Sequence, residues 1–359
     1  MRFDRLNIAL LSIVFAKVLP ILCVAVFATS PAFSADNVAA EVPPEGFATW
    51  LKALRTEAIE KGMSAQTVDA VVNDIKHLPR VIAKDRKQAE FHETYEEYLS
   101  KRVSPWRIKK GQALEKIDGD DIDRVTRKYN VPGRFVLAIL GVETNYGTIK
   151  LSYSAFDVLA TLSFDSRRGE RFRKEIFAAM EMLDKGLATQ DQLKSSWAGA
   201  LGQPQFMPST YLQFAQDFDG DGKKDIWTNN GDLFASVAKY LQHYGWQESE
   251  TWARKVVLPA GKVKQLEDDK VNHVALDKAC VRYEKHLTGW KTLDQWNALG
   301  VRRLNMTELP KVNMAASLIV TDEESGQGYL VYRNFCTLMR YNPSFKYALS
   351  VGGLSDHLK

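Results

Sequence analysis

The sequence lacks a strong excess of charge of either sign. Its 359 residues contain 48 Lys and Arg against 44 Asp and Glu, which gives a formal net charge of +4. No stripe of Lys and Arg interleaved with aromatic residues stands out, whereas nucleic-acid-binding domains usually carry one. The sequence therefore argues against a nucleic acid as partner. Internal repeats and low-complexity tracts are also missing, and a hydrophobic content of 45% is ample for a sizeable core.

A long uninterrupted hydrophobic run is missing as well. The longest apolar stretch, Val18 to Ala28, is broken by Pro20 and is shorter than a membrane-spanning helix requires. A basic start precedes it, and Ala32-Phe33-Ser34 follows with small residues where a signal peptidase cuts. We therefore expect residues 1–34 to be a signal peptide that directs export. The alternative is a retained membrane anchor.

Cysteine is scarce, with three residues in the chain. Cys23 falls in the expected signal peptide, and Leu22 before it is too bulky for a lipidation site. Cleavage would leave Cys280 and Cys336 in an oxidising compartment, where such a pair tends to bond. We expect a disulfide between them.

Helical patterns dominate the first 250 residues, and short β-like runs with charged turns follow from about Lys255. The predicted fold class is α+β, mostly helical. The helices and strands expected from the pattern are the following. Helices cover Phe47 to Lys61, Ser64 to Ile75, Arg86 to Lys101, Ile122 to Tyr129, Val131 to Glu143, Ser154 to Leu162, a stretch through Phe172 and Met180, Asp232 to Tyr244 and Met339 to Ala348; strands cover Val256 to Leu258, Val271 to Leu276, Met314 to Thr321 and Gly328 to Leu338.

One carboxylate stands out in an apolar helix. The run from Val131 carries no acidic residue before Glu143, and Val136, Ile139 and Leu140 share the helix face of Glu143. Pro132 suits the first turn, and Gly147 is the expected end of the helix. Burial and the negative end of the helix dipole would both favour a protonated carboxyl, as general acid catalysis requires. A buried Glu paired with Arg or Lys is the equally weighted alternative.

Two further stretches are dense in unusual residues. Ser195 to Ser209 is rich in small residues around Gln205, which suits either a ligand-binding backbone or a tight packing corner. Asp217, Asp219 and Asp221 alternate with Gly residues as in the start of an EF-hand loop, with the Lys223 carbonyl at the seventh position. The twelfth position is Thr228 instead of Glu. The pattern favours a Ca²⁺ ion, and an acidic turn without metal is the alternative.

Four ordered elements, GVETNYG, SSWAGALGQPQFMPSTY, DFDGDGKKDIW and RYNPSFKYA, resemble the B family of lytic murein transglycosylases. These are exported enzymes that cut peptidoglycan glycan strands in Gram-negative bacteria. The resemblance runs from about Phe47 to the end of the chain. It implies a lysozyme-like helical core over 81–250, an N-terminal helical part over 35–80, a small β-containing part over 251–330, and a segment over 331–359 that returns to the core.

The resemblance also implies roles for individual residues. Glu143 would be the sole catalytic acid and base. The substrate groove would include Ser196, Gln205, Tyr240, Tyr341, Asn342 and Tyr347, together with Tyr98 and Phe172. Structural Ca²⁺ would be bound by Asp217, Asp219, Asp221, the Lys223 carbonyl and Asp232, although the stretch before Asp232 is one residue longer than the family pattern.

Together these features predict a periplasmic lytic transglycosylase without an organic cofactor. It would cleave the β-1,4 bond between N-acetylmuramic acid and N-acetylglucosamine and leave 1,6-anhydromuramic acid ends. Most glycosidases use a pair of carboxylates, whereas this sequence offers one well-placed carboxylate, which supports a lytic transglycosylase. The alternatives are a hydrolytic muramidase and a non-catalytic, calcium-dependent cell-wall-binding protein. We expect a monomer whose partners are glycan strands and proteins that synthesise or remodel the cell wall.

Overall fold

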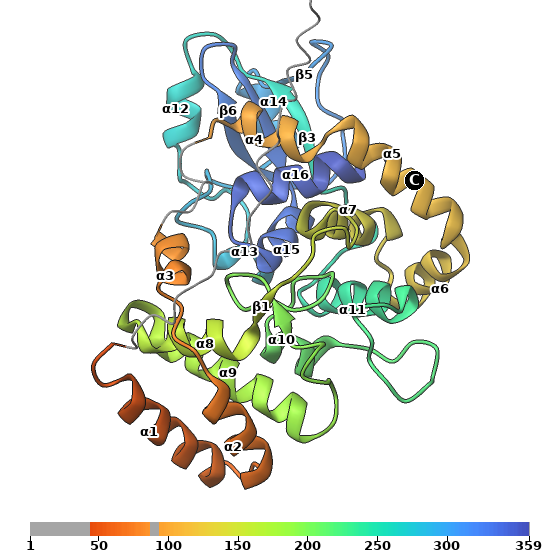
Figure 1. Ribbon diagram of the computed structural model, residues 1–359. Helices are drawn as coiled ribbons and strands as arrows, with labels where there is room; N and C mark the ends of the chain where they lie inside the picture. Colours follow the sequence, from red (N-terminus) through yellow and green to blue (C-terminus); the bar gives the residue numbers. More distant parts are fainter. Residues whose placement is uncertain (1–43, 87–92, 359) are drawn as a thin grey trace, which may run out of the picture. The chain divides into compact units, whose positions relative to one another are not determined.

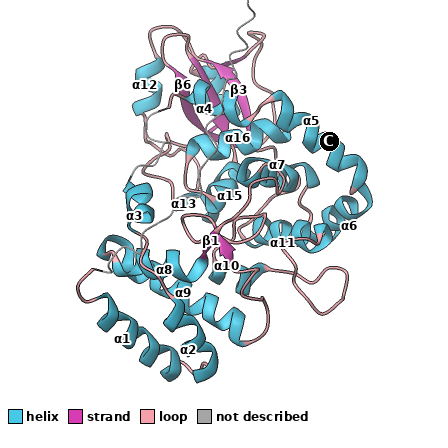
Figure 2. Cartoon of the chain, in the orientation of Figure 1, coloured by secondary structure: helices cyan, strands magenta, loops and turns pink. Residues whose placement is uncertain are grey.

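The computed structural model describes residues 44–86 and 93–358 (Figure 1). The expected signal peptide, residues 1–34, lies outside these ranges. Figure 2 shows helices throughout this part of the chain, one small sheet, and a separate short strand at β1. The helices are α1 Phe47–Glu60, α2 Ala65–Asp74, α3 Pro79–Arg86, α4 Tyr95–Arg102, α5 Pro105–Ile117, α6 Gly119–Tyr129, α7 Gly133–Thr144, α8 Ala155–Phe164, α9 Gly169–Asp184, α10 Pro208–Phe214, α11 Asn230–His243, α12 Val263–Asp268, α13 Lys278–Val281, α14 Leu293–Ala298, α15 Arg333–Tyr341 and α16 Phe345–Ser355.

Helix α7 lies at the centre of the main hydrophobic core. Its residues from Phe135 to Gly141 are all buried, which explains why its sequence is apolar on every side. Helices α6, α11 and α16 pack against it (Figure 1). The C-terminal helix α16 thus returns to the central helix, more than two hundred residues after α7 in the chain.

A five-stranded antiparallel sheet forms the β-containing part. Its strands lie in the order β4-β6-β7-β3-β5, with the long pair β6 and β7 at its centre. The bounds are β3 Ala253–Val257, β4 Lys291–Thr292, β5 Arg302–Arg303, β6 Ala315–Asp322 and β7 Gln327–Val331. Trp296 of α14, Leu318 and Leu330 belong to a second core that covers this sheet. The fold is α+β and mostly helical, as predicted.

Several predicted elements differ from the structure. Of the helix expected over Arg86 to Lys101, residues 87–92 lie outside the described ranges, and the described part is a separate helix, α4, because Thr94 caps it through a capping box with Glu97. Helix α5 was not predicted, since its sequence has little amphipathic pattern. The strand expected over Val271 to Leu276 is absent from the described chain. The strand expected over Gly328 to Leu338 ends at Val331, and α15 begins at Arg333.

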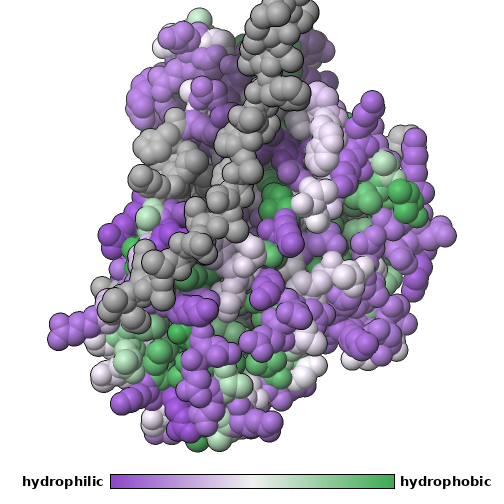
Figure 3. All heavy atoms as spheres, in the orientation of Figure 1, coloured by the Kyte–Doolittle hydropathy of each residue, from purple (hydrophilic) through white to green (hydrophobic). Residues whose placement is uncertain are grey.

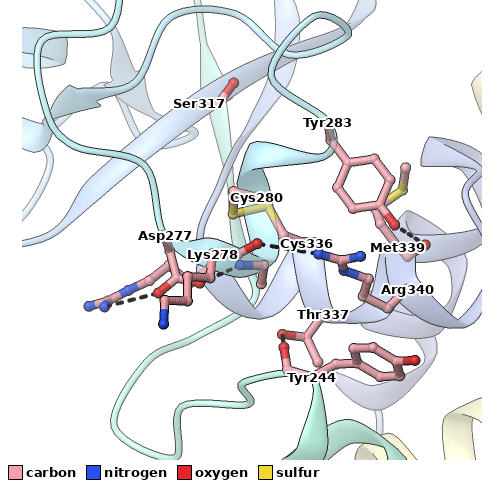
Figure 4. Close-up of a disulfide and its surroundings, with 12 residues drawn as sticks. Tyr244, Asp277, Lys278, Cys280, Tyr283, Ser317, Cys336, Thr337, Met339 and Arg340 are labelled. Carbon is pink, nitrogen blue, oxygen red and sulfur yellow. Dashed lines mark hydrogen bonds and ion pairs between the residues drawn. A yellow bond between two sulfur atoms is a disulfide. The ribbon is translucent and has the colours of Figure 1, made fainter.

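A disulfide joins Cys280 of α13 to Cys336 of α15, with the two Cα atoms 5.1 Å apart. This confirms the predicted pairing. Figure 4 shows the bond with a hydrogen bond from the Tyr283 hydroxyl to the Met339 carbonyl, 2.7 Å, beside it. Both sulfur-bearing residues are fully buried. The crosslink therefore fastens the start of α15, the helix that ends at Tyr341.

Candidate active site

The last turn of α7 carries Glu143, and the helix ends at the next residue, Thr144. Asn145, with a φ of 50°, is the left-handed C-cap, and Tyr146 and Gly147 continue with φ values of 57° and 74°. The predicted end at Gly147 is thus two residues late, and Pro132 precedes the first turn as the N-cap. Three successive residues with positive φ are unfavourable unless side chains hold them in place.

Two side chains supply that support. The Thr144 hydroxyl donates to the Gln203 carbonyl at 3.0 Å and accepts from the Gly147 amide at 3.1 Å. The Arg107 guanidinium donates through Nε to the Asn145 side-chain oxygen at 2.9 Å. A cation at this end of α7 also suits the negative end of the helix dipole. The backbone around Glu143 is therefore tied both to α5 and to the chain segment near Gln203.

Glu143 lines a cavity of about 170 Å³. The side chains around it come from the end of α7, from the segment leading into β1 (Tyr153–Ser154), from the segment at β2 (Lys194–Ser195), and from the turn that follows. The lining residues are Glu143, Thr144, Ile149, Lys150, Leu151, Ser152, Tyr153, Ser195, Ser196, Trp197 and Gln205. Glu143 is the one carboxylate among them.

A second hollow of about 250 Å³ adjoins the first. The two share Thr144, Ile149 and Leu151, and the second also contains Asp191 and Lys194. Together they extend the site along the end of α7. Figure 3 shows that hydrophilic side chains dominate the visible described surface, with smaller hydrophobic areas between them. The two hollows together give room for a ligand longer than one small molecule.

The small residues after Ser196 serve packing within the fold. A Cβ atom on Gly199, whose φ is +85°, would lie 2.5 Å from Leu159, and one on Gly202 would lie 2.9 Å from Ile226. The turn also closes on itself through bonds between the Leu201 and Phe206 backbones at 2.7 and 3.1 Å. The glycines therefore let the turn approach the core, which holds Ser196 and Gln205 beside Glu143.

Aromatic rings form a cluster on another side of Glu143. Tyr341 lies edge-on to Tyr240 at 4.9 Å and parallel to Tyr347 at 6.4 Å between ring centroids. The Tyr341 hydroxyl donates to the Pro204 carbonyl at 2.6 Å, and the Tyr240 hydroxyl donates to the Arg340 carbonyl at 2.6 Å. These bonds connect the end of α15 to the Gly202–Phe206 turn and to α11.

Burial, and then the charge of Glu143, hold the pKa values of Tyr341 and Tyr347 well above their usual range. Both phenols are neutral at physiological pH. The buried Tyr347 hydroxyl makes no hydrogen bond of good geometry within the described chain, although it is near enough to interact with the Glu143 carboxylate. A neutral phenol beside the carboxylate can donate a hydrogen bond to it or to a ligand.

The structure thus brings together some of the predicted groove residues and separates others. Ser196 and Gln205 line the same cavity as Glu143, and Tyr341 and Tyr347 interact with the Glu143 carboxylate. The ring of Tyr240 contacts the ring of Tyr341. Asn342 is the C-cap of α15. Tyr98 and Phe172 are 2% and 5% exposed in α4 and α9, and neither lines the cavity. Sequence reasoning did not single out Thr144 or Trp197, although both lie inside the quoted motifs, and Tyr153 had no motif to mark it.

The acidic loop gathers three carboxylates. Side-chain oxygens of Asp217, Asp219 and Asp221 lie within 4.8 Å of one another. The two oxygens of Asp217 accept the amides of Gly220 and Gly222 at 2.7 and 2.9 Å, which curls the loop around them. The Asp219 carboxylate also accepts the side-chain amide of Asn229 at 2.7 Å. Carboxylates held this close repel one another unless a cation lies among them.

Asp232, at the start of α11, ties the two ends of this loop together. It is fully buried, and its two oxygens accept the amides of Phe218 at 2.6 Å and Asp225 at 2.8 Å. Burial raises its pKa, and the charges of Asp219 and Asp217 add to that effect. Its oxygens do not belong to the group of three that meet within 4.8 Å. A nearby cation would stabilise the charged form of all four carboxylates.

Comparison with known proteins decides the family. Residues 46–356 match the family described as Transglycosylase SLT domain. The chain belongs to this family. It is also 31% identical over 261 residues to membrane-bound lytic murein transglycosylase B of Escherichia coli, an alignment that covers 72% of this chain and 66% of that protein. The predicted membership of the lytic murein transglycosylases is therefore confirmed.

Solved structures of other family members share the fold. SltB3 of Pseudomonas aeruginosa, in complex with NAG-anhNAM-pentapeptide, is 35% identical, with a TM-score of 0.77 over 87% of this chain and 79% of that one. The Escherichia coli lytic transglycosylase Slt35, in complex with calcium, is 27% identical, with a TM-score of 0.70 over 86% of this chain and 91% of that one.

The lytic murein transglycosylase B of Escherichia coli is called membrane-bound. In this transglycosylase, the helices within the described ranges are all too short or too polar to cross a membrane.

Proposed function

We propose that this transglycosylase cleaves the β-1,4 bond between N-acetylmuramic acid and N-acetylglucosamine in peptidoglycan, and that Glu143 is its one acid and base. The observation that carries the proposal is Glu143 as the single carboxylate of the cavity. Hydrolases that use two carboxylates place the second across the scissile bond. The ligand of SltB3, NAG-anhNAM-pentapeptide, supports an anhydro product for a chain of this fold.

The reaction follows from a single carboxyl group. Protonated Glu143 gives its proton to the glycosidic oxygen as the bond to the anomeric carbon of the muramoyl residue breaks. The resulting carboxylate then takes the proton of the muramoyl O6 hydroxyl, and O6 bonds to the anomeric carbon to close a 1,6-anhydro ring. No water is consumed, and Glu143 ends protonated as it began. The half-buried position of the carboxylate limits the access of water and so favours this intramolecular attack over attack by solvent.

The other cavity residues would orient the sugars. Gln205 and Ser196 offer polar groups on one side of Glu143, and the Tyr347 hydroxyl lies beside the carboxylate on another. The stacked rings of Tyr341 and Tyr347 stiffen that side. The groove assignments of Tyr240, Asn342, Tyr98 and Phe172 remain proposals that rest on the family resemblance. Export to the periplasm through residues 1–34 and a monomeric state belong to the same proposal.

Mass spectrometry of purified sacculi after digestion tests the function. Wild-type protein should release fragments that end in 1,6-anhydromuramic acid, each lighter by one water than the hydrolytic product. Reducing-end muramic acid as the main product would instead indicate a hydrolytic muramidase. Binding to sacculi without any release of fragments would indicate the non-catalytic alternative.

We also propose that the Asp217 loop binds one structural Ca²⁺. Asp217, Asp219 and Asp221 would supply carboxylate oxygens, and the Lys223 carbonyl accepts no hydrogen bond from the described residues. Asp232 would support the site from the protein interior, either by the hydrogen bonds it accepts from the two ends of the loop or as a further ligand of the ion. The ion would contribute stability and take no part in the chemistry. The calcium complex of Slt35 supports the choice of ion.

Calcium should raise the melting temperature of the wild-type protein. A ligand at 100 times its Kd adds about 2.7 kcal/mol to the free energy of unfolding, which corresponds to about 5 °C in Tm for a chain of this size. Differential scanning calorimetry with calcium and with EDTA measures the shift. Asp219→Ala should lose it, whereas Asp120→Ala, in the first turn of α6, should keep it. An equal shift in wild type and Asp219→Ala would refute the assignment.

A further inference from the structure

Helix α5 packs against α7 (Figure 1) and contacts the left-handed turn that follows Glu143. This turn consists of Asn145, Tyr146 and Gly147. The Tyr146 amide donates to the Leu140 carbonyl at 3.0 Å, so the turn folds back over the last turn of α7, which carries Glu143. A shift of the left-handed turn would therefore move the backbone that carries the carboxyl group.

The Arg107 guanidinium of α5 joins the ends of two other helices at this turn. Its Nε and Nη2 both donate to the side-chain oxygen of Asn145, the first at 2.9 Å. Its Nη1 donates to the carbonyls of Lys101 and Arg102, the last residues of α4, at 2.9 and 2.6 Å. Unpaired carbonyls make the C-terminal end of a helix negative, so one cation stabilises the ends of both α4 and α7.

A close fit around Tyr146 is the second contact of α5 with the turn. A Cβ atom on Gly111 of α5 would lie 2.4 Å from the Tyr146 hydroxyl oxygen, and one on Gly141 of α7 would lie 2.7 Å from it. The Tyr146 side chain is buried. Gly111 follows Arg107 by one helical turn, so both contacts come from the same face of α5. Helix α5 thus holds the left-handed turn at Asn145 and at Tyr146.

Arg107 does not line the cavity of Glu143 or the adjoining hollow. Any effect of Arg107 on the reaction therefore passes through the turn that it holds. The proposed reaction asks one carboxyl group to give a proton to the glycosidic oxygen and then to take a proton from the muramoyl O6. Both transfers need a carboxyl oxygen within hydrogen-bond reach, and a misplacement of about 1 Å can cost roughly 10²-fold in rate.

We propose that Arg107 is a positioning residue for catalysis, which fixes the turn after Glu143 so that the carboxyl group reaches both oxygens in succession. The inference rests on the proposed function. It places the effect of Arg107 in kcat and leaves KM nearly unchanged, because Arg107 touches no part of the substrate. The hydrogen bonds to Asn145 carry the effect. The Thr144 hydroxyl still holds the turn to the Gln203 carbonyl when these bonds are lost, so the loss of activity is partial.

The test is a double-mutant cycle on the two partners of this contact. The enzymes are wild type, Arg107→Gln, Arg107→Lys, Asn145→Gly and Arg107→Gln/Asn145→Gly. Glycine accepts the left-handed conformation at position 145, so Asn145→Gly breaks the same hydrogen bonds without strain and independently of how the Arg107 variants fold. The control is Lys109→Gln, which removes an exposed cation from the same helix.

The measurements are kcat and KM for the release of anhydro ends from soluble glycan strands. Circular dichroism at the assay temperature gives the folded fraction of each variant, and kcat is expressed per folded molecule. A purely structural role of Arg107 would change the folded fraction and leave this corrected kcat at the wild-type value.

Arg107→Gln should lower the corrected kcat by roughly 10–100-fold, with KM within about twofold of the wild-type value. Asn145→Gly should lower kcat as well, and the double variant should lose no more than Arg107→Gln alone, because the two side chains act through one contact. Arg107→Lys, which keeps a cation and its donors, should recover part of the loss. Lys109→Gln should match the wild type.

Three results would overturn the inference and leave the proposed function intact. They are a corrected kcat of Arg107→Gln at the wild-type value, a loss that appears in KM instead of kcat, and losses that multiply in the double variant. A wild-type enzyme that releases no anhydro ends would overturn both the inference and the proposed function.

Discussion

Replacement of Glu143 by Gln should lower the rate of anhydro-fragment release by at least about 10⁴-fold, since acid and base assistance each contribute roughly 10²–10⁴ and one residue supplies both. Gln keeps the size of the side chain and its hydrogen bonding but cannot give and then take a proton. No other carboxylate lines the cavity to replace it. Single-turnover digestion of sacculi, followed by quantification of soluble fragments, measures the loss.

The matched control is Asp191→Asn, which removes an exposed carboxylate from the adjoining hollow. It should change the rate by no more than a few-fold, because Asp191 does not line the cavity of Glu143. Glu143→Gln should also melt at or above the wild-type temperature, as the substitution removes a half-buried ionisable group. A Glu143→Gln enzyme that digests sacculi near the wild-type rate would end the assignment.

Loss of the disulfide should be the largest stability effect among these changes. The bond closes a loop with a sequence separation of 56 residues. In the chain-entropy account, closing a loop of that length adds about 4 kcal/mol to the free energy of unfolding, which corresponds to roughly 7 °C in Tm for a chain of this size. Cys280→Ala/Cys336→Ala should therefore melt about 7 °C below the oxidised wild type. Activity should fall as well, because α15 carries Tyr341 toward Glu143.

Treatment with a reductant separates the contribution of the disulfide to stability from the contribution of the packing of the two cysteine side chains. Wild-type protein in dithiothreitol should lose nearly as much stability as the double variant, and the double variant should lose nothing further. Thiol titration of denatured, unreduced protein should find neither Cys280 nor Cys336 reactive. Reactive thiols at both positions, or a double variant that melts with the wild type, would contradict the role assigned to the bond.

Helices with clear periodicity or caps were predictable because their signals are local. Ser64 accepts the amide of Thr67 as the N-cap of α2, and Ser154 does the same for Asp157 at α8. Misassigned elements lacked such a signal. The run Val271 to Leu276 looks like a strand, but no neighbouring strand pairs with it in the described chain. The apolar run after Gly328 changes from strand to helix at Arg333, a boundary that only the packing of β7 and α15 decides.

The sequence by itself determined the family, the helical class and the place of Glu143 on an apolar helix, because motif order and hydrophobic periodicity are written along the chain. The tertiary structure decided what surrounds that carboxylate. Tyr153 lines the cavity from a part of the chain that carries no motif, and Tyr347 interacts with Glu143 from about two hundred residues downstream. Contacts between residues so distant in sequence depend on how helices pack, and no local pattern records them.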